Sequence, residues 1–136
     1  MLRSEDDPVA TGEEWQMNET DLLHLFIKRA PFALPYLRVF RRNVLNVETK
    51  QGFRARNGIK GQADAYAIVH GGRHVEIETK AARGVMAEQQ KAWRAFCQTF
   101  DVPHLVLRAR PAEPPGETVN RWIEEMRAVV AKDTNA

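Results

Sequence analysis

Hydrophobic residues recur at helical spacing in three parts of the chain. The first is residues 19–30, which Asn18 can cap and which the sequence PFALP should end. The second is residues 86–100, and the third is a helix that begins with Thr118 as its cap. The side chains that we expect these last two helices to turn inward are Met86, Gln90, Trp93, Cys97 and Phe100, then Val119, Trp122, Ile123, Met126 and Val130.

Four other stretches have the β-branched and aromatic content of strands: residues 36–47, 63–70, 73–80 and 103–109. Two glycines at 71–72 join the middle two into a hairpin, which we place at the centre of the sheet. The last stretch follows a crossover helix, so it should pair in parallel with the strand that ends at residue 80. The pattern predicts an α/β domain with a mixed central sheet flanked by helices, in the order α-β-β-β-α-β-α.

The length of 136 residues fits one domain. We place it at residues 18–131, between an acidic, flexible segment at 1–17 and a flexible tail at 132–136. A content of 43% hydrophobic and 28% charged residues is typical of soluble proteins, and no apolar run approaches the roughly 18 residues of a membrane span. The N-terminus lacks the pattern of a secretory signal, and the single cysteine excludes an internal disulfide. We therefore expect a cytoplasmic protein with no membrane partner.

Positive charge is concentrated in the middle of the chain. Residues 28–60 hold nine bases against the single acid Glu48, whereas residues 1–21 hold seven acids and one base, Arg3. Such a basic block is either an ordinary solvated face or a set of phosphate contacts for a nucleic acid. It includes a glycine-bearing loop, RNGIKGQ, at residues 56–62.

The strand HVEIETK places Glu78 and Lys80 on one side of a strand that should otherwise be buried. The hairpin brings Asp64, at the start of the preceding strand, alongside its end. Two enclosed carboxylates repel each other unless a cation joins them, and hard oxygen ligands suit Mg²⁺ or Mn²⁺. An ammonium group on the same face can orient water or stabilise charge on a phosphoryl oxygen. This combination favours metal-assisted hydrolysis of phosphodiesters.

The length of the hairpin turn sets a condition on this site. If Gly71 and Gly72 alone form the turn, Asp64 pairs with Thr79 and lies on the opposite side of the sheet from Glu78. We therefore predict a three-residue or bulged turn, or an irregular entry at residues 63–64, that restores a common side.

Four segments in register carry a family resemblance: ETDLLHLFIKRA, GIKGQADAYAIV, EIETK and GVMAEQQKAWRAF, spread over residues 19–108. Together they resemble the PD-(D/E)xK nucleases, most closely the VRR-Nuc family of virus-type replication and repair nucleases. In that family a glycine-bearing loop leads into an aspartate, a short hairpin leads to E-x-K, and a glutamine lies on the next helix. The chain departs from this pattern at Ala63, where a proline is usual, and at Thr79, where an aliphatic residue is usual.

The resemblance implies a restriction-endonuclease-like core and a metal-dependent endonuclease that acts on DNA in replication, repair or recombination. It implies a metal site made by Asp64, Glu78 and the Thr79 carbonyl, with Glu19 reaching the metal directly or through water. Lys80 and Gln90 would then serve the attacking water and the scissile phosphate. Stand-alone members of the family are similar to junction resolvases and tend to be homodimers, in a bacterial or phage-infected cell.

Several readings of these residues stay open. Glu19 also suits a helix N-terminus, where the dipole favours an acid, and Gln90 also suits a hydrogen-bonded core amide. We expect Glu76 and His74 to be exposed or at a rim, and both Trp93 and Trp122 to lie in the core. The residues that are candidates for phosphate contacts are Arg41, Arg42, Arg54, Arg56 and Lys60.

Two other functions compete with a DNA nuclease. The first is a non-catalytic nucleic-acid-binding or assembly protein that retains the fold. The second is an RNA-processing enzyme, which should use His, Tyr and Lys rather than paired acids. The sequence leaves open whether the substrate is a junction, a flap, a plain duplex or RNA.

Overall fold

A computed structural model describes residues 17–42, 46–48, 54–56 and 59–134 of the chain. Its helices and strands, in chain order, are α1 (Glu19–Ala33), β1 (Leu37–Arg41), β2 (Asn46–Glu48), β3 (Arg54–Arg56), β4 (Ala65–Val69), β5 (Arg73–Lys80), α2 (Glu88–Thr99), β6 (His104–Arg108) and α3 (Pro115–Thr134). The expected flexible segment at 1–17 lies, except for Met17, outside the described residues. None of the described helices is both long enough and apolar enough to cross a bilayer.

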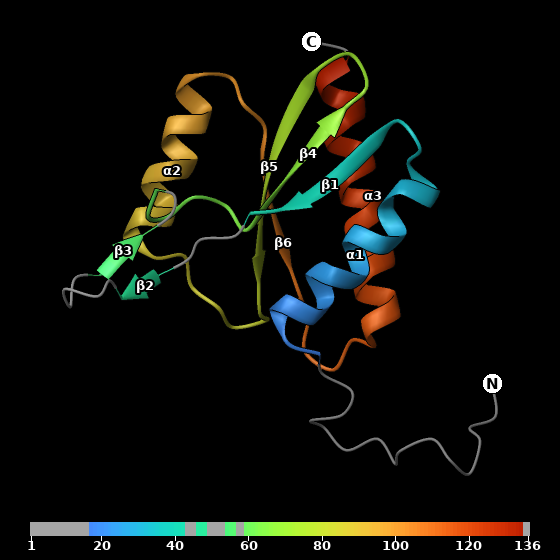
Figure 1. Cartoon of the computed structure of the whole chain (residues 1–136). Helices are drawn as coiled ribbons and strands as arrows, with labels where there is room; N and C mark the ends of the chain where they lie inside the picture. The colour runs from blue at the N-terminus through green and yellow to red at the C-terminus, as the bar shows by residue number, and fades with distance from the viewer. Residues whose placement is uncertain (1–16, 43–45, 49–53, 57–58, 135–136) are drawn as a thin grey trace.

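Four strands form one mixed sheet in the order β1-β4-β5-β6 (Figure 1). The β1/β4 and β4/β5 pairs are antiparallel, and β5/β6 is parallel. The predicted mixed sheet, its central hairpin and its parallel last strand are therefore confirmed. Helices α1 and α3 lie on one side of this sheet and α2 lies on the other, so the domain is a layered α/β structure (Figure 1).

The hydrophobic core fills the space between the sheet and the α1/α3 layer. Alternate strand residues reach it, including Val39, Ala67 and Ile77, each at most 6% exposed. From the helices, Phe26 and Trp122 meet edge to face with ring centroids 6.2 Å apart. Each large apolar side chain buried in this way contributes about 1.5–3 kcal/mol. The predicted inner face of the last helix is confirmed, because all five of its residues are buried.

Helix α1 begins as predicted but ends later. The Asn18 side chain accepts a hydrogen bond from the Asp21 N–H at 2.8 Å, which confirms the cap. The helix was expected to stop at residue 30, yet it continues through Pro31 to Ala33. Proline removes one backbone donor, at a cost of about 3 kcal/mol inside a helix. The added turn ends at Leu34, which is fully buried and whose N–H donates to the Ala30 carbonyl, and this burial offsets the cost.

The other two helices also differ from their predicted bounds. Helix α2 is shorter than residues 86–100, and Phe100, expected to face inward, is 63% exposed. Helix α3 begins at Pro115, so Thr118 is not its cap; the Thr118 hydroxyl instead donates to Glu113 Oε1 at 2.8 Å. Its far end runs to Thr134, past the expected end of the ordered domain at residue 131.

The stretch 36–47 is not one strand. Strand β1 ends at Arg41, and β2 pairs instead with β3 in a separate two-stranded ribbon. Nothing in the sequence indicates this break. Neither the two successive arginines at 41–42 nor the short apolar pattern predicts that β1 ends there. The described part of the expected loop at 56–62 does form a turn, in which the Gln62 N–H donates to the Ile59 carbonyl.

Candidate functional site

The turn of the β4–β5 hairpin has three residues. Val69 pairs with Arg73, so residues 70–72 connect the strands, and the two glycines there have φ of +92° and +81°. Ala65 pairs with Ile77, and the same register places Asp64 opposite Glu78. The predicted three-residue turn is confirmed. Asp64 itself lies just before the paired residues, and its negative charge is close enough to Glu78 to raise the pKa of that acid.

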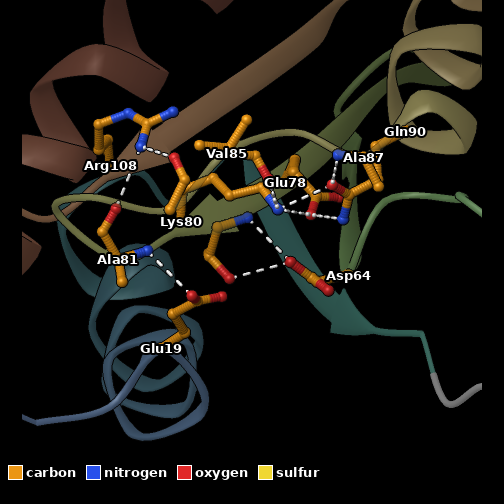
Figure 2. Close-up of polar contacts among 11 residues, drawn as sticks. Glu19, Asp64, Glu78, Lys80, Ala81, Val85, Ala87, Gln90 and Arg108 are labelled. Carbon is orange, nitrogen blue, oxygen red and sulfur yellow. Dashed lines mark hydrogen bonds and ion pairs between the residues drawn. The ribbon is translucent and has the colours of Figure 1, made fainter.

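Glu78 is a buried acid with one oxygen left over. It is 1% exposed, and its Oε1 accepts a hydrogen bond from Gln90 Nε2 at 2.8 Å and lies 3.7 Å from Lys80 Nζ (Figure 2). Its Oε2 is buried with no hydrogen-bond partner among the described residues. Burial, and next the negative charge of Asp64, raise the pKa of Glu78 to about 8 against the opposing charge of Lys80. This carboxylate lacks a positive partner that fully compensates its charge.

Lys80 and Gln90 form one unit with Glu78. Lys80, 8% exposed, donates from Nζ to Gln90 Oε1 at 2.7 Å and to the Val85 carbonyl at 3.4 Å. The same Gln90 oxygen accepts from the Ala87 N–H at 2.8 Å and so caps α2. Gln90 therefore donates to the acid and accepts from the base, which fixes the orientation of its amide.

Asp64 lies beside this unit, between two pockets. Its Oδ2 accepts hydrogen bonds from the Thr79 N–H at 2.9 Å and the Thr79 hydroxyl at 3.0 Å (Figure 2). One pocket, of about 220 Å³, has Asp64, Glu19 and Arg41 in its wall. The other, of about 310 Å³, has Asp64, Gln90 and Lys60 in its wall. Asp64 thus borders open space on both sides, whereas Glu78 and Lys80 line neither pocket.

Glu19 reaches the same region from the first turn of α1. It is half-buried, and its Oε1 accepts a hydrogen bond from the Ala81 N–H at 3.0 Å, directly beyond the end of β5 (Figure 2). Its negative charge also helps to raise the pKa of Glu78. The structure therefore brings Glu19 near the two acids and ties it to the backbone.

Glu76 was expected to be exposed or at a rim, and this prediction is wrong. It is 1% exposed, and it accepts two hydrogen bonds from Arg42 at 2.8 and 2.9 Å and one from Trp93 Nε1 at 2.9 Å. His74 Nε2 lies 2.6 Å from its other side. Burial alone would raise the pKa of Glu76, but Arg42, His74 and Trp93 together lower it. The acid is buried because β5 is central and α2 covers this face.

The candidate phosphate-binding residues have different environments. Arg42 is engaged in the Glu76 pair and also donates to the Ala63 carbonyl at 2.9 Å. Arg41 and Lys60 are exposed, and each borders one of the pockets beside Asp64. Arg54 and Arg56 belong to β3, and their side chains lie outside the described part of the structure.

The two tryptophans also differ. Trp122 is fully buried in the core, as expected. Trp93 is half-buried and stacks on Phe96, with ring centroids 5.2 Å apart, while its indole N–H bonds Glu76. Sequence reasoning missed the Glu76 cluster. The available signal was the alternation of His74, Glu76, Glu78 and Lys80 on one face of a central strand, where each charge needs a partner.

A divalent cation has two carboxylates to bind here. Within the described residues, no group of three or more His, Cys, Asp or Glu side chains is arranged to hold a metal. However, Mg²⁺ commonly takes only one or two protein carboxylates together with water and substrate phosphate. Asp64 and Glu78, with the unpartnered Oε2 of Glu78, fit that requirement.

Neither a scan against protein-family models nor a search of the curated proteins matched the chain.

Proposed function

We propose that this protein is a Mg²⁺- or Mn²⁺-dependent endonuclease with a restriction-endonuclease-like core, and that it hydrolyses phosphodiester bonds of DNA. The observation that carries the proposal is the buried, unpartnered Oε2 of Glu78 beside Asp64, with Lys80 and Gln90 on the other carboxylate oxygen. The resemblance of the four sequence segments to the VRR-Nuc family supports the same chemistry.

An unpartnered carboxylate oxygen in a buried site is costly, because it has lost its water and gained no donor. A cation between Asp64 and Glu78 would remove that cost and the repulsion that raises the pKa of Glu78. By resemblance, the Thr79 carbonyl and Glu19 would complete the donor set. A bound Mg²⁺ supplies Lewis-acid stabilisation and lowers the pKa of a coordinated water.

The protein's own contribution is to hold a base and an amide at fixed positions. Lys80 is restrained by Gln90 and the Val85 carbonyl, so its ammonium group can stabilise negative charge on a phosphoryl oxygen without reorganising. Gln90 makes a hydrogen bond to each of these two groups, Lys80 and Glu78, whose charged atoms lie 3.7 Å apart. Such preorganisation is the main way in which enzymes catalyse phosphoryl transfer.

DNA would approach over the basic residues beside the pockets. Arg41 and Lys60 are exposed there and suit phosphate contacts, and Arg42, Arg54 and Arg56 are further candidates. Such contacts position a duplex without reading its sequence. A homodimer would supply the two sites that paired cuts require.

A cleavage panel tests this function. Linear, nicked, flapped and four-way DNA are incubated with the protein and Mg²⁺ or Mn²⁺, beside Glu78→Gln and the matched surface variant Glu124→Gln. We expect at least one DNA form to be cut, the Glu78 variant to lose about 10³-fold or more in rate, and the Glu124 variant to cut normally. Equal cutting by the Glu78 variant would mean that a contaminant is responsible and would overturn the proposal.

A non-catalytic DNA-binding protein of the same fold is the second candidate. The raised pKa of Glu78 favours it, because a carboxyl with a pKa of about 8 is largely neutral at pH 7 in the absence of a cation. Calorimetric titration with Mn²⁺ separates the two. A nuclease should bind Mn²⁺ and lose that binding in Asp64→Asn, whereas a binder should keep its salt-dependent DNA affinity and take up no metal at these residues.

A further inference from the structure

Strand β5 presents two acids on one face, and α2 contacts each of them with one side chain. Trp93 Nε1 donates to Glu76 Oε1 at 2.9 Å, and Gln90 Nε2 donates to Glu78 Oε1 at 2.8 Å. Glu76 and Glu78 are two residues apart on a strand, so they share one face of β5. Gln90 and Trp93 are three residues apart on a helix, so they share one face of α2. The helix is therefore aligned with the strand by two neighbouring polar contacts.

Apolar packing holds α2 only weakly. Of its twelve residues, Cys97 is the buried one, whereas Phe96 is 50% exposed. Its first turn lies against Gly61, where an added Cβ would come within 2.3 Å of the Gln89 carbonyl oxygen. Between the contact at Gly61 and the buried Cys97, the position of α2 over the sheet depends on its hydrogen bonds to Glu76 and Glu78.

Glu76 itself is fixed from the other side. Both of its oxygens accept from Arg42, which also donates to the Ala63 carbonyl, and the Arg42 N–H donates to the Asp64 carbonyl at 2.8 Å. A bidentate pair of this kind has a set direction as well as a charge. The carboxylate that receives Trp93 is thus anchored to the backbone beside Asp64.

We infer that Glu76 is a positioning residue of the nuclease site: through Trp93 it holds α2 so that Gln90 stays on Glu78 and Lys80. The inference rests on the proposed function, because it assigns Glu76 a part in that site. Glu76 does not contact the reacting groups. It acts through the indole N–H of Trp93 and the amide of Gln90, one helical turn away.

The decisive variant is Trp93→Phe, which removes the indole N–H and keeps an aromatic ring to stack on Phe96. We expect kcat for DNA cleavage to fall roughly 10- to 100-fold with KM unchanged, because small displacements of a catalytic group have effects of this size. Cys97→Ala is the matched control, since it trims the buried side chain of α2 but removes neither of the hydrogen bonds from this helix to the acids. It should leave kcat within about twofold at a temperature where both variants are folded. Equal losses in the two variants would mean that Trp93 only stabilises the helix.

A double variant tests the route through Gln90. If Glu76 and Trp93 act by placing Gln90, then Trp93→Phe should cost nothing more in a Gln90→Ala background. Losses that multiply would show that Trp93 acts independently and would overturn the inference.

A measurement without cleavage separates this inference from the proposed function. The side-chain amide of Gln90, held between Glu78 and Ala87, should give a distinct signal in a ¹⁵N NMR spectrum. That signal should move in Trp93→Phe and Glu76→Gln but not in Cys97→Ala. If the wild-type protein cuts no DNA, the proposed function fails while the amide signal still decides whether Glu76 places Gln90. A signal that stays fixed in Trp93→Phe refutes the positioning role even in an active enzyme.

Discussion

The two faces of the central sheet have opposite chemistry. On the face toward α1 and α3, β5 contributes Val75 and Ile77 to a continuous apolar core. On the face toward α2, the same strand contributes Glu76, Glu78 and Lys80, all buried and all polar. Because neighbouring residues of a strand point to opposite sides, one short segment serves both faces. The comparison indicates that the apolar packing lies mainly on one side of the sheet and the buried charges of β5 on the other.

The largest expected effect is on catalysis. If the proposed function holds, Lys80→Met, which keeps the length of the side chain and removes its charge, should lower DNA cleavage by about 10³-fold. At pH 6 the Glu78 carboxyl is neutral, because burial raises its pKa to about 8, so the free energy of unfolding should fall by no more than about 1 kcal/mol. Cleavage rates and urea unfolding curves measure the two quantities. Unfolding as severe as that of a core variant would contradict the division between the faces.

On the face toward α1 and α3, Trp122→Ala should lower stability and leave the metal dependence of cleavage unchanged. Trp122 is fully buried against Phe26, so its truncation should lower the free energy of unfolding by about 3–5 kcal/mol. The fraction that remains folded should keep the wild-type dependence of cleavage on metal concentration. A changed metal dependence would show that the core and the site are coupled.

A pH series tests the raised pKa of Glu78 on the face toward α2. Because the folded pKa of Glu78 is raised to about 8, folding takes up a proton between the unfolded pKa of 4.5 and pH 8. Without metal, stability should therefore be highest near pH 5 and fall by on the order of 2–4 kcal/mol as pH rises to 8. Glu78→Gln should abolish that slope in unfolding curves measured in EDTA. A slope that persists in this variant would belong to another group.

The smallest effect should come from the exposed end of α2. Phe100 is 63% exposed, so Phe100→Ser should change the free energy of unfolding by no more than about 0.5 kcal/mol. The sequence pattern alone had placed Phe100 in the core. A loss above 2 kcal/mol would show that α2 packs through this residue after all.

Most of the fold could be predicted from the sequence wherever a regular hydrophobic pattern ended at clear boundary residues. Alternation in residues 73–80, two glycines before them and a crossover helix after them are local signals, and they predicted the central hairpin and the parallel last strand. The helical period predicted the inner face of α3 for the same reason. For α2 the period identified the side that faces the sheet at Gln90, Trp93 and Cys97. It missed the ends, because period does not show where a helix stops or how closely it approaches the sheet.

The candidate site, like the fold, could be predicted only in part from the sequence. The grouping of Asp64, Glu78 and Lys80 followed from pairing rules within one hairpin. The partners of Glu76 did not, since Arg42 lies 34 residues before it and Trp93 lies 17 residues after it in the chain. These groups come into contact only in the tertiary structure, so no local sequence pattern predicts their hydrogen bonds. The passage of α1 through Pro31 was also unpredictable, because it depends on the burial of Leu34.

The three-residue turn at 70–72 makes the geometry of the site depend on chain length at a remote point. A hairpin with one residue fewer there would keep a full ladder of backbone hydrogen bonds and lose almost nothing in pairing. Relative to β4, however, it would turn an aliphatic side chain of β5 toward α2 and a carboxylate toward the apolar core. An insertion or deletion of one residue in this distant loop would therefore change which side chains of β5 face α2, without altering any residue of the candidate site.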